Sequence, residues 1–271
     1  MNSIGGDWLS TSTDRKPARR VILLGASNLV RSISTVVETA RELWREPVEI
    51  MAAIGHGRSY GQDSRMLGRK ISGIFPSALW KDLQSRPALP TVALVTDVGN
   101  DLGYGVSVPE LISWVDGCLT HLDRARATTI ITELPLARLD RLSERQFLFF
   151  RTLFFPRSRL TFADIRTRAS ELNDSLLTLG ERRKISVIPV SGAWYGLDPI
   201  HLRRSSWREA WPTILSAWHD RDPLTVRPRT SFARWAYLRS LAPAEHTFFG
   251  WDRRTAQPSG VLRDGTTISL Y

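Results

Sequence analysis

Short, mostly apolar runs alternate along the chain with longer segments in which apolar residues recur at helical spacing. The runs lie at 20–24, 48–54, 91–95, 128–132 and 185–189, and the main helical segments at 28–44, 109–122, 161–179 and 205–218. A short apolar run is typical of a strand that is buried on both faces. Because strands that alternate with helices form parallel sheets covered on both sides, the sequence predicts a three-layer α/β/α sandwich with five parallel strands.

The remaining segments divide the chain into three parts. Residues 1–18 are polar and are expected to be a loose lead-in, 19–221 hold the predicted sheet, and 222–271 form a C-terminal extension rich in Pro, Arg and aromatic residues. Asp264-Gly265 is flanked by apolar residues, which predicts a β-hairpin near the end of the extension. Two short helices are expected around 63–71 and 76–85.

Composition is that of an ordinary globular protein, with 42% hydrophobic and 24% charged residues. A single cysteine, Cys118, rules out an intrachain disulfide. The first twenty or so residues lack the apolar core of a signal peptide, and no apolar run approaches the ~18 residues of a membrane span. These features predict a cytoplasmic protein without a membrane span.

The chain is strongly basic, with a formal net charge of +10, and only four of its 37 basic residues are lysines. Arginine suits bidentate contacts with carboxylate or phosphate, which indicates an anionic substrate, nucleic acid or an acidic membrane surface as the class of partner. Arginine pairs such as Arg19-Arg20 and Arg253-Arg254 are scattered, however, and no nucleic-acid motif accompanies them. We therefore expect a small-molecule substrate and no nucleic acid, and the oligomeric state is left open.

Polar turns follow three of the predicted strands, at Gly25–Asn28, 55–61 and 97–101. In parallel α/β sheets, ligands bind outside the carboxyl ends of the strands, where such turns meet. The sequence therefore predicts that these three turns share one site. Asp97 and Asp101 are expected to accept hydrogen bonds from loop N–H groups there.

Two segments carry the residue types of nucleophilic catalysis. Ser27 lies between a strand and a helix, where backbone N–H groups favour a developing oxyanion; the alternative is that it only caps the helix. Asp198 and His201 lie three residues apart after the last strand and can serve as orienter and base. The alternative for this second pair is that it only stabilises the start of the last helix.

These residues form an ordered set of motifs that resembles the SGNH (GDSL-like) hydrolases. Gly25-Ala-Ser-Asn28 resembles the first block, Gly99-Asn-Asp101 the third and Asp198-Pro-Ile-His201 the fifth. The resemblance implies a flavodoxin-like fold with strand order 2-1-3-4-5, and hydrolysis of an ester or thioester through an acyl-enzyme on Ser27 without metal or organic cofactor. It also implies that Asn100 donates to the oxyanion, together with a backbone N–H of Gly57 or Gly55.

The motifs depart from the family pattern at two positions. Ala26 replaces the usual Asp of the first block, and Val98 stands where the third block often has Gly. These departures leave open a catalytically silent domain that binds an acylated or glycan ligand. A nucleotide-binding domain is a further alternative, but the Gly-x-Gly-x-x-Gly pattern is missing after the first strand.

Other residues near the predicted site are candidates for substrate binding. His56, Arg58 and Tyr60 belong to the glycine-rich turn and are expected to contact the substrate, together with Gly55. The aromatic segment 147–155 lies between the fourth and fifth strands; we expect it to face the core, with an acyl pocket as the alternative.

Overall fold

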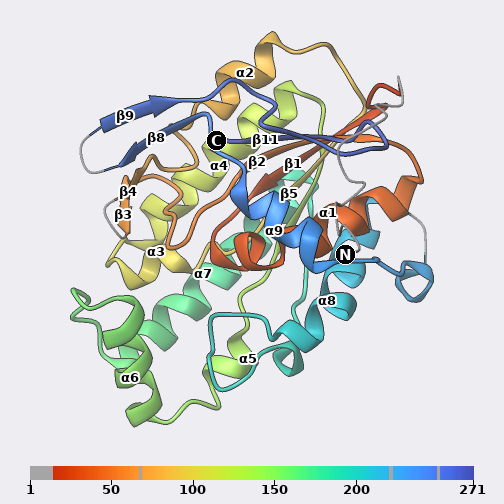
Figure 1. The fold of residues 1–271 in the computed structure, drawn as a ribbon. Coiled ribbons are helices and arrows are strands. Elements are labelled where there is room, and N and C mark those ends of the chain that lie inside the picture. The colour runs from red at the N-terminus through yellow and green to blue at the C-terminus, as the bar shows by residue number, and fades with distance from the viewer. Residues whose placement is uncertain (1–14, 67–68, 220–221, 249–250) are drawn as a thin grey trace, which may run out of the picture.

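The five apolar runs form five adjacent strands of one sheet in the computed structural model, which describes residues 15–66, 69–219, 222–248 and 251–271 (Figure 1). The five strands are β1 (Arg19–Leu24), β2 (Val48–Ala53), β5 (Thr91–Val95), β6 (Thr128–Thr132) and β7 (Ser186–Ile188). They pair in parallel, side by side, as β2-β1-β5-β6-β7. All five carboxyl ends therefore lie at the same edge of the sheet.

Helices cover both faces of this sheet, as the sequence predicts. One face packs on α1 (Ser27–Trp44), α8 (Trp207–Leu215) and α9 (Phe232–Ser240), and the other on α2 (Leu79–Ser85), α4 (Val108–Arg124) and α7 (Phe162–Arg183). Successive side chains of β1 point to opposite faces, so that Val21 and Leu23 enter one core and Ile22 and Leu24 the other. The continuous apolar run of β1 is thus explained by burial on both sides.

The sheet is larger than predicted. It has seven strands within the described residues, in the order β10-β11-β2-β1-β5-β6-β7, so the prediction of a five-stranded, wholly parallel sheet is wrong. The added strands, β10 (Gly260–Val261) and β11 (Thr267–Leu270), come from the C-terminal extension. Strand β11 pairs in parallel with β2, and β10 runs antiparallel to β11. The extension covers an edge of β2 that would otherwise expose unpaired backbone groups.

The predicted hairpin at Asp264-Gly265 is confirmed, since it joins β10 to β11. Gly265 has a φ of +94°, a backbone conformation that residues other than glycine rarely adopt.

The domain boundaries predicted at residues 18/19 and 221/222 stay a prediction. Most of the lead-in, residues 1–14, lies outside the described residues.

A second, antiparallel sheet flanks the first. Its strands are β3 (Ser64–Met66), β4 (Arg69–Ile71), β8 (Glu245–Phe248) and β9 (Trp251–Arg254), in that order. The helix expected around 63–71 is therefore wrong, whereas the one expected around 76–85 is present as α2. Strand β4 pairs with β8, a segment far along the chain that local spacing around 63–71 does not reveal.

Helix α7 begins as predicted and ends later. Thr161 and Asp164 form the predicted capping box at its start. The helix continues through Gly180 to Arg183, so the end predicted at Gly180 is wrong. A Cβ on Gly180 would lie 2.4 Å from a methyl carbon of Val187 in β7, which shows that this glycine permits close packing of helix on strand.

Three further helices lie near the carboxyl edge of the sheet: α3 (Asn100–Gly103), α5 (Leu136–Leu139) and α6 (Glu144–Phe154). Helices α5 and α6 precede α7 in the connection between β6 and β7 (Figure 1). None of the helices in the described ranges is both long enough and apolar enough to cross a bilayer.

Candidate active site

Ser27 is the first residue of α1, directly after the turn that leaves β1. Ala26 holds the helix-cap position, so the interpretation of Ser27 as a helix cap is not supported. The Ser27 hydroxyl lies instead 2.8 Å from Nε2 of His201. Ser27 is largely buried, and its hydroxyl lies in the wall of an open cleft together with His201.

His201 and Asp198 lie on the loop after β7 and face Ser27. Nδ1 of His201 is 2.6 Å from Oδ2 of Asp198, while Oδ1 of Asp198 accepts the N–H groups of Ile200 at 2.9 Å and His201 at 3.2 Å. Burial opposes ionisation of Asp198, but the hydrogen bond and charge of His201 and these backbone bonds outweigh it and lower the pKa of the carboxyl. An ionised Asp198 assigns the proton of the neutral ring to Nδ1 and leaves Nε2 free to accept the Ser27 proton.

Asp97 supports the turn that holds Ala26 and Ser27. Its Oδ2 accepts the N–H groups of Ala26 at 2.9 Å and Asn28 at 3.1 Å, so the expectation that Asp97 binds loop N–H groups is confirmed. Asp97 has a φ of 60°, which aspartate tolerates better than most residues. The carboxylate that holds the turn of Ser27 therefore comes from the end of β5.

Asp101 makes a similar contact with the glycine-rich turn. Its carboxylate accepts the Ser59 hydroxyl and, at 3.0 Å, the N–H of Tyr60, as expected from the sequence. Burial raises the pKa of Asp101 to about 6, despite these two hydrogen bonds. Two neighbouring turns are thus tied to the segment 97–101.

The side chain of Asn28 has a role that sequence reasoning missed. Its amide donates to Oδ1 of Asp97 at 2.7 Å and to the carbonyl of Ile200 at 3.0 Å. Its oxygen accepts the N–H of Leu202 at 2.9 Å. A polar residue at the start of a helix was the only signal in the sequence, and it did not reveal these distant partners.

The proposed oxyanion donors lie beside Ser27 in the same cleft. Asn100 is the first residue of α3 and lines the cleft, as does Gly57, which has a φ of +61°. Neither the Asn100 side-chain amide nor the Gly57 N–H donates to any group in the described ranges. Gly55 does not line the cleft, and its carbonyl accepts the N–H of Arg58. This placement favours Gly57 over Gly55 as the backbone donor.

Arg58 and Tyr60 do not line the cleft, so the substrate contacts predicted for them are wrong. Both side chains are fully buried. Arg58 donates to backbone carbonyls, among them that of Ser72 at 3.0 Å, and the Tyr60 hydroxyl donates to the carbonyl of Thr96 at 2.8 Å. His56 does line the cleft, and its contact with a substrate stays a prediction.

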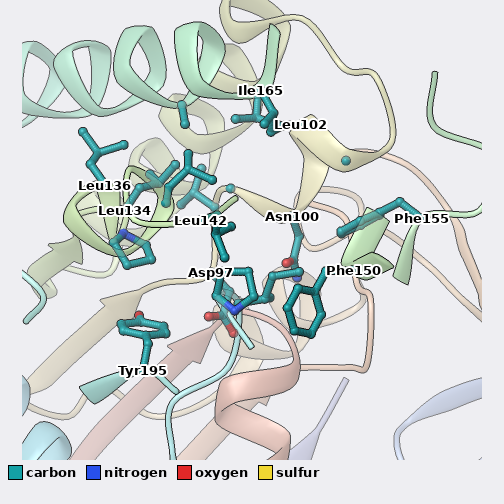
Figure 2. Close-up of a pocket in the computed structure, with 18 of the residues that line it drawn as sticks. Asp97, Asn100, Leu102, Leu134, Leu136, Leu142, Phe150, Phe155, Ile165 and Tyr195 are labelled. Carbon is teal, nitrogen blue, oxygen red and sulfur yellow. The ribbon is translucent and has the colours of Figure 1, made fainter. Parts of the chain in front are cut away.

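An apolar cavity of about 170 Å³ adjoins the cleft, beneath α5, α6 and α7. Figure 2 shows Leu134, Leu136 and Leu142 on one side of it and Phe150 and Phe155 on the other, next to Asn100. The residues that line both cavity and cleft are Asn100, Gly103, Phe155, Ser158 and Ile200. The two spaces therefore meet at the proposed oxyanion donor.

Segment 147–155 is only partly core-facing, contrary to the expectation. Phe147, Phe150 and Phe155 line the cavity, and the ring of Phe154 lies edge-on to that of His201 with centroids 5.2 Å apart. Leu148, Phe149 and Leu153 are 44%, 63% and 58% exposed. The inward side of α6 therefore fits the alternative prediction, a pocket wall, better than the prediction of a core-facing helix.

Comparisons with known proteins identify no family for the chain. No model of a protein family matches it, and no curated protein matches it significantly.

Within the described ranges no cluster of His, Cys, Asp and Glu side chains is arranged to hold a metal ion.

Several solved structures are similar in fold at low identity. The psychrotrophic esterase EstA from Pseudoalteromonas sp. is 12% identical over 73% of this chain and 97% of its own, with a TM-score of 0.47. An acetyl xylan esterase, AlAXEase, is 12% identical over 73% of this chain and 98% of its own, also at 0.47. AlinE4, an SGNH-hydrolase family esterase, is 18% identical over 82% of this chain and 92% of its own, at 0.38. At these identities and TM-scores the likeness establishes neither the family nor the activity of this chain.

Proposed function

We propose that the protein is a serine hydrolase that cleaves an ester or thioester through an acyl-enzyme on Ser27. The observation that carries the proposal is the chain of hydrogen bonds from Asp198 through His201 to Ser27, at 2.6 Å and 2.8 Å. Serine alone is a weak nucleophile, and this arrangement supplies both the base that it needs and the carboxylate that orients the base.

In the first half of the reaction, the Ser27 hydroxyl attacks the substrate carbonyl while Nε2 of His201 takes its proton. The carbonyl oxygen becomes an oxyanion, toward which the Asn100 amide and the Gly57 N–H donate. His201 then gives the proton to the departing alcohol or thiol, and an acyl group remains on Ser27. In the second half, water attacks this acyl group, His201 takes the proton of the water, and the acid leaves as Ser27 regains its proton.

Labelling with a fluorophosphonate probe tests the nucleophile directly. We expect the probe to modify Ser27 in the wild type, and Ser27→Ala and His201→Ala each to lose at least about a thousandfold in hydrolysis of a short acyl ester. Ser34→Ala is the matched control, because Ser34 is buried in the same helix and its hydroxyl has no partner among the described residues. Persistent hydrolysis by both triad variants would refute the proposal, and binding of esters without turnover or labelling would favour a silent binding domain.

A further inference from the structure

The cavity and the cleft, which meet at Asn100, differ in the chemistry of their walls. The cavity is walled mainly by Leu, Ile, Phe and Pro. Three charged residues also line it: Glu133, Asp97, which is engaged with the turn of Ser27, and Arg151, which donates to the carbonyl of Leu160 at 2.9 Å. An apolar cavity of about 150 Å³ in another protein holds benzene, so this cavity has room for an apolar group of roughly six carbon atoms.

The cleft, by contrast, is lined by three arginines. Arg31, Arg157 and Arg239 share its wall with Ser27 and His201. Arg157 and Arg239 are exposed, and neither forms an ion pair with any side chain that the structure describes. The guanidinium of Arg239 stacks over the ring of Trp235 at 5.1 Å.

The acidic groups near the cleft do not offset this charge. Asp63 pairs with Nζ of Lys70 at 2.7 Å, and Asp198 is bound to His201, with Arg31 at 4.0 Å. Burial, together with the charges of Arg239, His201 and Arg31, lowers the pKa of His56. The cleft therefore presents unneutralised guanidinium groups to whatever part of a substrate lies there, and such groups bind carboxylate and phosphate through paired hydrogen bonds.

We infer that the substrate is an ester or thioester with a short apolar acyl chain, held in the cavity, and an anionic leaving group, held by the arginines of the cleft. This inference rests on the proposed function, because it assigns the two sides of the bond that Ser27 attacks. Asn100 lies where cavity and cleft meet, so a carbonyl oxygen at its amide leaves one side of the scissile bond to each space, and the apolar acyl chain is assigned to the apolar cavity.

Four esters that share a hexanoyl group and differ only at the end of the alcohol test the leaving-group side. The alcohols are ethylene glycol, choline, 3-hydroxypropionate and 2-hydroxyethyl phosphate, which are neutral, cationic, carboxylate-bearing and phosphate-bearing. We expect kcat/KM for at least one anionic ester to exceed that of the glycol ester by about tenfold, and the choline ester to be poorest. The preference should shrink as salt is added. The anionic ester with the higher kcat/KM shows whether the natural leaving group carries a carboxylate or a phosphate.

Charge-reversal variants locate the preference. Arg157→Glu and Arg239→Glu should each reduce the anionic-to-neutral ratio of kcat/KM by about tenfold, whereas Arg229→Glu, the same charge change at an exposed arginine outside the cleft, should leave it unchanged. Equal rates on all four esters, or a ratio that all three variants alter alike, would overturn the inference while leaving Ser27-dependent hydrolysis intact. Absence of any Ser27-dependent hydrolysis would instead refute the proposed function.

The acyl side is tested by chain length. Wild-type kcat/KM should peak at chains of about six carbons and fall for longer ones. Ala169→Leu adds volume to the cavity wall and should move the peak to shorter chains, and Leu142→Ala removes volume and should move it to longer ones. A peak at acetyl in the wild type, or a peak that neither folded variant moves, would contradict the acyl assignment.

Discussion

The side-chain amide of Asn28 lies 2.7 Å from the carboxylate of Asp97 and also donates to the carbonyl of Ile200 at 3.0 Å. One amide thus joins the turn of Ser27, the end of β5 and the loop of His201. The distance between the proposed nucleophile and its base depends on this connection, since Ser27 and His201 lie 174 residues apart in sequence.

Removing this connection should impair the reaction more than substrate binding. We expect Asn28→Ala to lower kcat by about 10- to 100-fold with a smaller change in KM, because a misplacement of about 1 Å between reacting groups costs on the order of 100-fold. Steady-state kinetics on a soluble ester measures the separate changes in kcat and KM, with Ser34→Ala as the control on the same helix. An unchanged kcat would show that Asn28 does not position His201.

Asn100 should stabilise the transition state more than the bound substrate. Asn100→Ala removes a side-chain donor that makes no hydrogen bond with the described residues, so the fold should be little affected. We expect kcat to fall by about 100- to 1,000-fold with a modest change in KM, as for loss of an oxyanion donor elsewhere. Urea unfolding checks stability alongside the kinetics. A variant as active as the wild type would exclude Asn100 from the oxyanion site.

Asp101 should make stability depend on pH. Burial raises the pKa of this carboxyl to about 6 from an ordinary value of 3.8. Between these values the folded protein keeps a proton that the unfolded chain has released. The free energy of unfolding therefore falls as pH rises through this window, by up to about 3 kcal/mol, and levels off above it.

The comparison with Asp101→Asn isolates this contribution, because all other titrating groups are shared. Urea unfolding between about pH 4 and pH 7 should give a wild type that loses stability relative to the variant as pH rises. Parallel curves for the two proteins would show that Asp101 ionises normally in the folded state.

Arg58 should be structural. Its fully buried guanidinium donates to the carbonyls of Ser72, Ile54 and Tyr271 and so ties the glycine-rich turn to the end of β11. We expect Arg58→Met to lower the free energy of unfolding by about 3 kcal/mol or more, because several buried carbonyls lose their donor. The exposed control Arg229→Met should stay within about 0.5 kcal/mol of the wild type. A small effect of Arg58→Met would contradict a structural role.

The sequence predicts those parts of the fold that depend on local pattern. The strand 20–24 is apolar at nearly every position because helices cover both of its faces, and Asp264-Gly265 marks a turn that needs a positive φ. The pairing of β11 with β2 and of β4 with β8 depends on contacts between distant segments, which local spacing does not encode.

The same distinction holds at the candidate site. Ser27, Asp198 and His201 could be singled out because residue type and motif order point to one chemistry, and they lie within hydrogen-bond distance of one another; their roles stay predictions. The sequence assigns Arg58 to the substrate because arginine is usually exposed, whereas its burial follows from carbonyl partners on other segments. Position along the chain alone could not reveal those partners.

The place of β11 in the sheet has a consequence for synthesis of the protein. The N–H of Val48 at the start of β2 meets the hydroxyl of Thr266, 218 residues later, just before β11 pairs along the same strand. While the chain emerges from a ribosome, β2 has one open edge until residues 266–270 are made. Products that stop earlier expose a strand ready to pair with other chains, and so become targets for aggregation and cellular quality control.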